Sequence, residues 1–294
     1  MRIVSLLPSA TEILFAIGAG DELAGVTHEC DYPPQARVLP VLTRSALPAA
    51  GSPADIDRHV RASVHEGSSL YHLDAELLER LNPDLIVTQE LCAVCAVSYE
   101  TVDRAVKRLR GDPRIVSLEP NWLGDVLQTM LYLGDVTSHA EGARRAVGEL
   151  RARIDAMRAQ TAARDVRPRV LLLEWTEPPM SAGHWIPDLI ELAGAVPVLA
   201  SPGSNSVTLE WQAIAASDPD AVVVAPCGLD AAASAAATAA LDAVLQWTSL
   251  RAYREERIFA MDGNAYVSRP GPRVVESAEI IRAWLEAPSG SPLR

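Results

Sequence analysis

The sequence predicts an α/β fold made of two Rossmann-like lobes with central parallel sheets, joined by one long backbone helix. Short apolar runs alternate with helix-like stretches in both halves of the 294-residue chain. This alternation is typical of parallel strands with crossover helices. A long amphipathic stretch lies between the two alternating regions. We therefore expect an N-terminal lobe at 1–137, a linking helix at 138–165 and a C-terminal lobe at 166–294.

The first half opens with a strand followed by a helix. An apolar run at 3–7 stops at Pro8, and Ser9 or Thr11 can cap the helix that follows. Gly18 is placed to end this helix with a positive φ angle. The other elements expected in this half are strands at 24–26, 85–89 and 114–118, an inserted helix near 56–64, and a helix at 123–132.

The middle of the chain carries a helical pattern. Val147, Leu150, Ile154 and Met157 recur at spacings of three and four residues, with arginines and acids between them. The pattern predicts a helix over 139–163, roughly 35 Å long at 1.5 Å per residue. The second half then predicts strands at 169–174, 221–225 and 257–261, helices at 231–245 and 274–287, and core positions at Trp247 and Trp284.

Composition and charge exclude several classes of partner. Apolar residues make up 49% of the chain and charged residues 22%, which is a globular composition, and the net charge is −12. An acidic chain is a poor match for nucleic acid or for anionic membranes. No apolar run of 18 residues exists, so no membrane insertion is expected. The sequence as written carries no signal peptide, which predicts a cytoplasmic protein, or a periplasmic one if a leader was removed.

The densest polar chemistry lies in the loop after the strand at 24–26. Five residues, His28 to Tyr32, supply an imidazole, two carboxylates, a thiol and a phenol. The loop follows the carboxyl end of its strand, which is where ligands bind in open α/β sheets.

Several motifs resemble the cobalamin and iron-chelate substrate-binding family with a helical backbone, and most of all its cobalamin-binding members. They span nearly the whole chain: SLLPSATE at 5–12, DYP at 31–33, NPDLIV at 82–87, PPMSAG at 178–183, DPDAVVV at 218–224 and RPGPR at 269–273. The resemblance implies a largely preformed ligand cleft between the lobes. It also implies non-catalytic binding of cobalamin or a related corrinoid, for uptake with an ABC permease or for intracellular handling.

A corrin offers a flat apolar face and a rim of amides, so a binding protein needs aromatic surfaces and hydrogen-bonding groups. The candidates for ligand contact are His28, Glu29, Asp31, Tyr32, Arg44, Glu90, Trp122, Trp175, Trp185, Ser206, Tyr266 and Arg269. Each aromatic candidate can serve packing instead. Tyr266 matches an aromatic residue of the cobalamin binders.

The chain also departs from the best-known transport members of the family. Glu29, Arg44 and Ser206 stand where those proteins carry aromatic residues. The ligand can then be a corrin held differently, a corrin precursor or another metal chelate. An iron-siderophore or similar chelate is the alternative, and Arg44, Arg269 and Arg273 would suit its negative charge.

Histidine and cysteine suggest two further hypotheses. A neutral His28 imidazole can be an axial ligand of cobalt or iron, although it can equally bond its own loop. Cys30, Cys92 and Cys95 can join His28 in a soft-metal site, and the latter two cysteines have redox spacing. Both can also be inert thiols. The sequence shows no nucleophile elbow, no phosphate-binding loop and no pair of catalytic carboxylates. We therefore expect a protein without catalytic activity.

Family members that dock on a permease place a glutamate near a helix start in each lobe. Glu76 is the first counterpart here. The second position is Gln212, and Glu210 lies nearby, turned by about 200° if both residues are helical.

Overall fold

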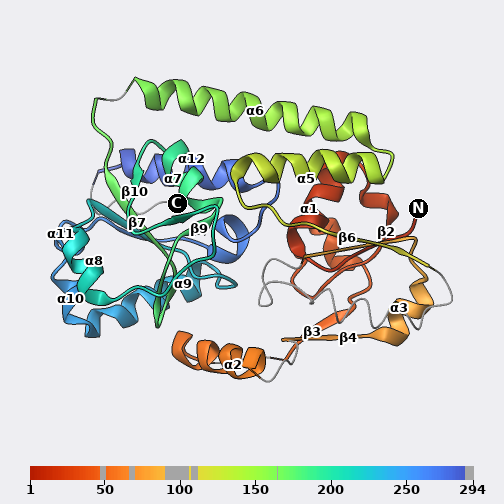
Figure 1. Cartoon of the computed structure of the whole chain (residues 1–294), viewed down its shortest axis with the longest axis horizontal. Helices are drawn as coiled ribbons and strands as arrows, with labels where there is room; N and C mark the ends of the chain where they lie inside the picture. The colour runs from red at the N-terminus through yellow and green to blue at the C-terminus, as the bar shows by residue number, and fades with distance from the viewer. Residues whose placement is uncertain (47–50, 66–69, 90–105, 107–111, 164, 289–294) are drawn as a thin grey trace. The chain divides into compact units, whose positions relative to one another are not determined.

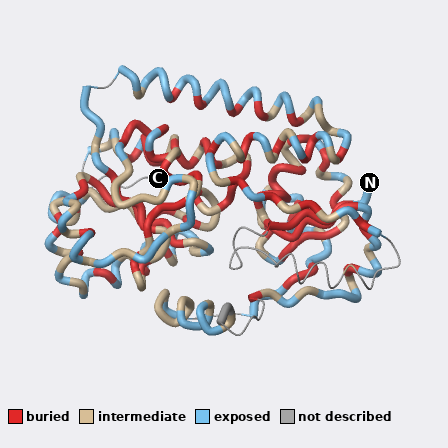
Figure 2. Tube along the Cα trace, viewed as in Figure 1, coloured by how far each residue is buried: buried red, intermediate tan, exposed pale blue. Residues whose placement is uncertain are grey.

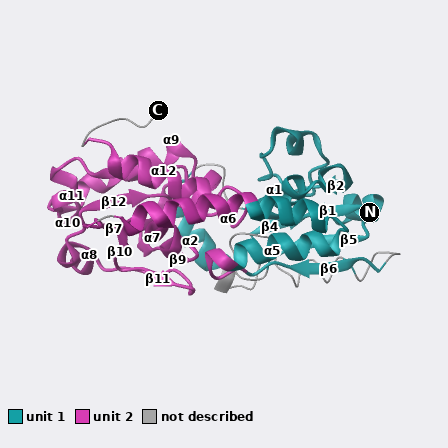
Figure 3. Cartoon of the chain, turned by 90° about the horizontal axis from the view of Figure 1, so that it is seen from above, with its two compact units in different colours: residues 1–51, 55–119, 125–148 teal, residues 52–54, 120–124, 149–294 magenta. Residues whose placement is uncertain are grey.

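The computed structural model of the chain describes residues 1–46, 51–65, 70–89, 106, 112–163 and 165–288. The chain divides into two compact units (Figure 3). Unit 1 comprises residues 1–51, 55–119 and 125–148, and unit 2 comprises residues 52–54, 120–124 and 149–294. The lobe limits expected from the sequence stay a prediction, because helix α6, Ala140–Ala162, contributes residues to both units.

Unit 1 contains a parallel sheet in the strand order β2-β1-β5-β6 (Figure 1). Its strands are β1 Ile3–Ser5, β2 Leu23–Gly25, β5 Leu85–Thr88 and β6 Arg114–Ser117. A separate antiparallel pair consists of β3 Thr43–Ser45 and β4 Tyr71–Leu73. The other elements are α1 Pro8–Ile17, η1 Gly20–Glu22, η2 Pro34–Val38, α2 Pro53–His65, α3 Ala75–Leu81 and α5 Leu123–Val136.

Helix α1 begins at a proline rather than at a polar cap. Its N-cap residue is Leu7, and no side chain caps the helix, so the predicted cap by Ser9 or Thr11 is wrong. Pro8 suits the first helical position because it has no N–H that needs a partner there. The predicted end of the helix is confirmed, since Gly18 follows it with a φ angle of 93°.

The central strands β1 and β5 of the unit 1 sheet are buried on both faces. Val4 and Ile86 pack with Leu6, Leu42 and Leu78 in one apolar cluster. The alternate residues of the same strands point to the opposite face and are also buried, which Figure 2 shows as the red strands of this unit. Burial on both faces explains why these strands are continuous apolar runs in the sequence.

Unit 2 contains a second parallel sheet, in the order β10-β7-β12-β13, with β8 added antiparallel to β7. Its strands are β7 Arg169–Thr176, β8 Pro179–Ser181, β10 Val196–Pro197, β12 Ala221–Val224 and β13 Ile258–Ala260. A two-stranded parallel pair joins β9 Gly183–His184 to β11 Ser201–Pro202. The helices are α7 Ile186–Leu192, α8 Trp211–Ser217, α9 Ala231–Ala240, η3 Leu241–Ala243, α10 Leu245–Thr248, α11 Arg251–Arg254, η4 Gly263–Val267 and α12 Val274–Glu286. The predicted α/β class, with a parallel sheet in each half, is confirmed.

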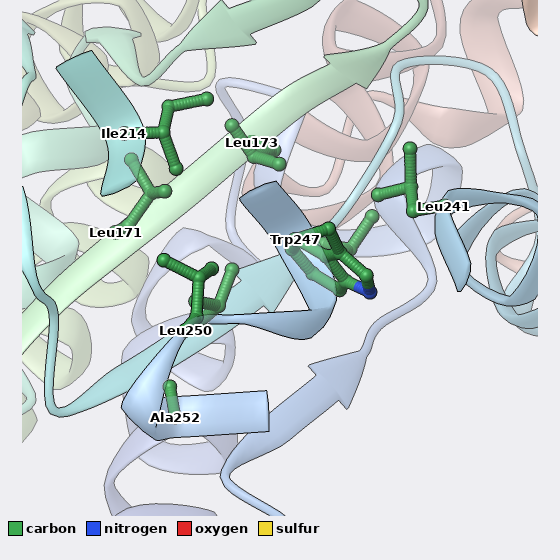
Figure 4. Packing of buried hydrophobic residues seen from close by; sticks show 9 residues of the cluster. Leu171, Leu173, Ile214, Leu241, Trp247, Leu250 and Ala252 are labelled. Carbon is green, nitrogen blue, oxygen red and sulfur yellow. The ribbon is translucent and has the colours of Figure 1, made fainter. Parts of the chain in front are cut away.

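The core of unit 2 gathers around Trp247 (Figure 4). Its indole is 1% exposed and packs with leucines and valines of β7 and β12. Trp284 is 5% exposed, so both tryptophans predicted as core residues are confirmed. The predicted helix at 231–245 is too long, because α9 ends at Ala240. The chain then turns so that Leu241 and Trp247 both enter the core.

Helix α6 shows the predicted amphipathic pattern. Val147, Leu150, Ile154 and Met157 are all at most 5% exposed, while the residues between them are mostly exposed (Figure 2). Among the helices that the structure describes, none has the length and apolar character needed to cross a bilayer.

Two glycines of α6 provide a matched test of packing in unit 1. A Cβ atom on Gly142 would lie 1.9 Å from the Ile17 carbonyl oxygen, whereas a Cβ on Gly148 would meet nothing within 4 Å. We expect Gly142→Ala to lower the free energy of unfolding by about 1–3 kcal/mol through overpacking. Gly148→Ala should raise it by about 0.5–1 kcal/mol through helix propensity. Urea denaturation measures both, and equal effects of the two substitutions would contradict the packing of α6 on α1.

Candidate functional site

In unit 1, the loop after β2 is anchored by Cys30. The Sγ atom of Cys30 lies 3.1 Å from the Thr11 hydroxyl and 3.2 Å from the Thr27 hydroxyl. The Thr11 hydroxyl in turn donates to the Ser5 hydroxyl over 2.9 Å. All four side chains are buried. Cys30 therefore holds the polar loop against the start of α1 and the end of β1.

His28 is fixed by Thr43, the first residue of β3. The His28 backbone N–H donates to the Thr43 hydroxyl oxygen over 3.1 Å, and Nδ1 of the ring lies 2.7 Å from the same atom. The Tyr71 ring centroid is 5.8 Å from the imidazole centroid. Burial lowers the pKa of His28, although part of the ring remains exposed. The contact with Thr43 therefore restrains the imidazole, and partial burial favours its neutral form.

The other predicted residues of this loop differ in exposure. Glu29 accepts a hydrogen bond from the Tyr71 hydroxyl over 3.4 Å. The backbone carbonyl of Asp31 accepts one from Arg37 Nε over 2.8 Å. Tyr32 is 45% exposed. We call His28, Glu29, Thr43 and Tyr71 the His28 cluster.

Four further predictions concern exposed or undescribed residues. Arg44 is exposed on β3. Glu76 is exposed in the first turn of α3, which Asp74 caps. Glu90, Cys92 and Cys95 lie outside the described residues. Within the described part of the chain, no group of three or more histidine, cysteine, aspartate or glutamate side chains is arranged to hold a metal ion.

In unit 2, a carboxylate lies near the carboxyl end of β7. Glu174 accepts a hydrogen bond from the Gly183 backbone N–H over 2.5 Å and another from the Ser206 hydroxyl over 2.6 Å. Burial raises the pKa of the Glu174 carboxyl, while the bonds from Ser206 and Gly183 act in the opposite direction. Glu174 thus connects β7 to β9 and to the loop that contains Ser206.

His184 and Trp185 follow directly in β9 and its connection to α7. Their rings stack with centroids 5.7 Å apart. Burial lowers the pKa of His184, and a hydrogen bond to the Asn205 side chain opposes this shift. Trp185 is 6% exposed, and its Nε1 donates to the Val267 carbonyl over 2.9 Å. Trp185 therefore also packs β9 against the η4 segment.

The remaining predicted aromatic residues of unit 2 are half-buried or exposed. Trp175 Nε1 donates to the Glu177 carbonyl over 3.1 Å. Trp122 is 46% exposed and lies so close to Gly203 that a Cβ there would be 2.1 Å from its ring. Tyr266 lies in η4, and the Arg273 guanidinium is 5.6 Å from its ring centroid. Their predicted ligand contacts stay predictions.

Two other predicted positions are resolved in unit 2. Arg269 is 4% exposed, and its Nη2 donates to the Asn264 side chain over 3.1 Å. Glu210 is not in a helix: it is the N-cap residue of α8 with an extended backbone. The angle of about 200° expected between Glu210 and Gln212 is therefore wrong, because only Gln212 is helical.

Sequence reasoning did not select Thr43, Tyr71, Glu174 or His184. Thr43 and Tyr71 come from β3 and β4, whose pairing is not visible in the local pattern. Glu174 had a usable signal, since it is a charged residue within a buried strand run.

A cavity of about 350 Å³ lies elsewhere in unit 2. Its lining residues are Leu123, Gly124, Arg158, Thr161, Ala162, Arg167, Asp188, Glu191 and Leu192. None of these was predicted to bind a ligand, and two arginines and two acids leave it without a clear charge preference. The polar clusters at the strand ends offer more specific ligand chemistry than this cavity.

The family model described as periplasmic binding protein matches residues 3–265. The chain belongs to the periplasmic binding protein family. The family resemblance predicted from the sequence is thereby confirmed. The chain is 23% identical to the vitamin B12-binding protein of Vibrio cholerae, over 97% of this chain and 89% of that one. It is 24% identical to the cobalamin-binding protein of Halobacterium salinarum, over 94% of this chain and 66% of that one.

Solved periplasmic binding proteins share the fold. One is a possible iron-binding protein of Staphylococcus epidermidis, with a TM-score of 0.73, 21% identity, and coverage of 97% of this chain and 98% of that one. Another is the heme-binding protein of Roseiflexus, with a TM-score of 0.72, 24% identity, and coverage of 96% and 97%. The vitamin B12-binding protein of Vibrio cholerae has a TM-score of 0.67, 21% identity, and coverage of 97% and 96%.

The raised pKa of Glu174 predicts how stability changes with pH. Between the unfolded and folded pKa values, the folded state binds a proton that the unfolded state does not, so rising pH destabilises the wild type. Glu174→Gln removes this titration. The free energy of unfolding of the variant minus that of the wild type should therefore increase as pH rises above about 4.3. Urea denaturation at several pH values measures the difference, and a decrease with pH would show that the two donors outweigh burial.

Proposed function

We propose that the chain is a non-catalytic binding protein for cobalamin or a related corrinoid. The observation that carries this proposal is the His28 imidazole, which Thr43 orients and whose pKa burial lowers. An imidazole must be neutral to coordinate cobalt, and its other ring nitrogen is usually held by a hydrogen bond. The lowered pKa of His28 and its contact with Thr43 support this role. The names of the relatives from Vibrio cholerae and Halobacterium salinarum support the choice of ligand.

The Thr43 hydroxyl can serve His28 in two ways. If Nδ1 donates to Thr43, Nε2 keeps its lone pair and can coordinate a metal. If Thr43 donates to Nδ1, Nε2 carries the proton and can donate to a carbonyl at the corrin rim. The two cases predict different ligand preferences. If His28 coordinates the metal, the chain should bind hydroxocobalamin, whose axial ligand exchanges, more tightly than cyanocobalamin. If His28 contacts only the corrin rim, the two affinities should be similar.

The alternative ligand is an iron chelate or a heme. Solved relatives named for iron and heme binding have the same fold. The exposed Arg44 in unit 1 offers a positive charge for anionic groups of such ligands. Arg269 supports this alternative less, because it is 4% exposed and bonded to Asn264. A Cys92–Cys95 metal or redox module remains a prediction about residues outside the described structure.

We further propose that Glu76 and Glu210 are docking residues for an ABC permease. Both are exposed, one in the first turn of α3 and the other at the N-cap of α8. If the chain instead handles its ligand in the cytoplasm, charge reversal at Glu76 should leave uptake unchanged. Cell fractionation with an antibody against the chain separates the two locations.

The experiment that tests ligand binding uses the visible spectrum. Hydroxocobalamin incubated with the purified chain should remain bound through desalting, with a shifted absorbance. His28→Gln should weaken binding at least tenfold, and Thr43→Val about 10–100-fold, because a metal-ligating histidine depends on the group that orients it. His59→Gln is the matched control, since His59 is exposed on α2.

Three outcomes separate the ligand classes. Retention of hydroxocobalamin by the wild type and loss in His28→Gln support the proposal. If the wild type retains hemin or a ferric chelate but no cobalamin, the alternative ligand class is supported and cobalamin is wrong. If neither cobalamins nor iron chelates are retained, chelate binding is wrong.

A further inference from the structure

Glu174 is a partly buried acid within strand β7. In the described part of the chain its carboxylate has no cationic partner, and its two hydrogen bonds come from uncharged donors, Gly183 and Ser206. A buried carboxylate without an opposite charge is costly. Hydrogen bonds to an ionised group are stronger than neutral ones, which offsets part of that cost. A residue retained under this cost needs a specific positional reason.

The contact geometry around Gly183 supplies that reason. A Cβ atom on Gly183 would lie 2.6 Å from the Ser206 backbone nitrogen and 2.8 Å from the Ser204 carbonyl oxygen. Strand β9 and the loop at 204–206 therefore touch through their backbones, at a distance that only glycine permits. The Glu174 carboxylate bonds both of these touching segments to β7.

Backbone hydrogen bonds define the same junction. The His184 N–H donates to the Ser204 carbonyl over 2.7 Å, and the Gly203 N–H donates to the His184 carbonyl over 3.0 Å. The far end of the loop is tied to β8, where the Val207 N–H donates to the Ser181 hydroxyl over 3.0 Å. Between these two attachments, the Ser206 hydroxyl donates to Glu174.

The segments joined by Glu174 carry predicted ligand residues. Trp185 follows β9 directly and stacks with His184, Ser206 lies in the loop, and Trp122 packs on Gly203. A shift of the loop relative to β9 would move Ser206 relative to Trp185. The two bonds to Glu174 act against such a shift, together with the backbone bonds between His184 and the loop.

We infer that Glu174 is a positioning residue for metal-chelate binding: through Gly183 and Ser206 it fixes β9 and the loop at 204–207, and so the ligand-contacting groups that they carry. This inference rests on the proposed chelate-binding function. Glu174 itself does not touch the ligand. Its carboxylate is occupied by the two donors and acts through them.

The chemistry predicts which substitutions preserve this role. Glutamine keeps a carbonyl oxygen for the Gly183 N–H, and its amide can donate to the Ser206 hydroxyl, which rotates to accept. Leucine has a similar size but accepts neither bond, so it leaves two donors without a partner. Glu174→Gln should therefore rescue what Glu174→Leu loses. A purely volume-filling role would not distinguish them.

The first measurement is hydrogen exchange on the chain without ligand. In Glu174→Leu, the amides of Gly183, His184 and Ser206 should exchange about tenfold faster than in the wild type, because local opening is easier. In Glu174→Gln they should exchange within about threefold of the wild type. Equal exchange in wild type and Glu174→Leu would overturn the inference, whatever the chain binds.

The second measurement is the affinity for hydroxocobalamin and hemin, on variants shown to be folded by circular dichroism. Glu174→Leu should lose about tenfold or more in affinity, and Ser206→Ala about threefold or more. The loss in the double variant should be smaller than the sum of the two single losses, because both substitutions break the same bond. Glu191→Leu is the matched control, since Glu191 is an exposed acid on α7.

The outcomes distinguish this inference from the proposed function. A folded Glu174→Leu variant that binds as the wild type does, or a Glu174→Gln variant as weak as Glu174→Leu, would overturn the positioning role. If Glu174→Leu does not fold, Ser206→Ala decides, and unchanged affinity and exchange in that variant would overturn the role. A wild type that binds neither chelate would overturn the proposed function, while the exchange measurement would still test whether Glu174 fixes the loop.

Discussion

The central strands of both parallel sheets are buried on their two faces, and this constraint determines where polar chemistry can be placed in each unit. Val4 and Ile86 in unit 1, and Leu171 and Val222 in unit 2, are completely or almost completely inaccessible to solvent. A charged or hydrogen-bonding side chain in the middle of such a strand would be costly. Functional groups are therefore restricted to strand ends and to the loops that follow them. The His28 cluster follows β2, and Glu174 lies near the end of β7.

The two clusters use different means to hold a side chain in place. His28 is oriented by a neighbouring hydroxyl and remains partly exposed, which leaves its ring accessible to a ligand. Glu174 is partly buried and accepts hydrogen bonds from two donors, so it acts on the segments that carry them. The His28 cluster thus suits direct contact with a ligand, and Glu174 suits the support of neighbouring segments. Preorganised contacts of this kind bind more tightly because less ordering is needed when the ligand arrives.

Periodicity in the sequence was sufficient to predict the strands of the unit 1 sheet, β7, β12 and β13 of the unit 2 sheet, and the buried face of α6, but not the short strands β8 and β10. These features depend on which residues are apolar, and that information is local. The helix starts were harder to predict, since Pro8 replaced the expected cap of α1. The early end of α9 also could not be predicted, because the alanine-rich composition favours a helix and does not show that Leu241 joins Trp247 in the core.

The candidate site was predictable only in part, for a related reason. His28 and Glu29 stood out because they are adjacent in a dense polar loop. Their partners Thr43 and Tyr71 come from β3 and β4, so their role depends on pairing between distant segments. Ser206 was selected as a ligand contact, yet its hydroxyl donates to Glu174, 32 residues away. Motif resemblance identified the family, while long-range hydrogen bonds determine what each side chain can do.

The measurement that tests the central claim most directly is the metal content and visible spectrum of the chain purified from its own source. The account predicts cobalt together with corrin absorbance, in amounts approaching one per chain after growth with added cobalamin. Protein that emerges colourless and without cobalt or iron under the same conditions would contradict it.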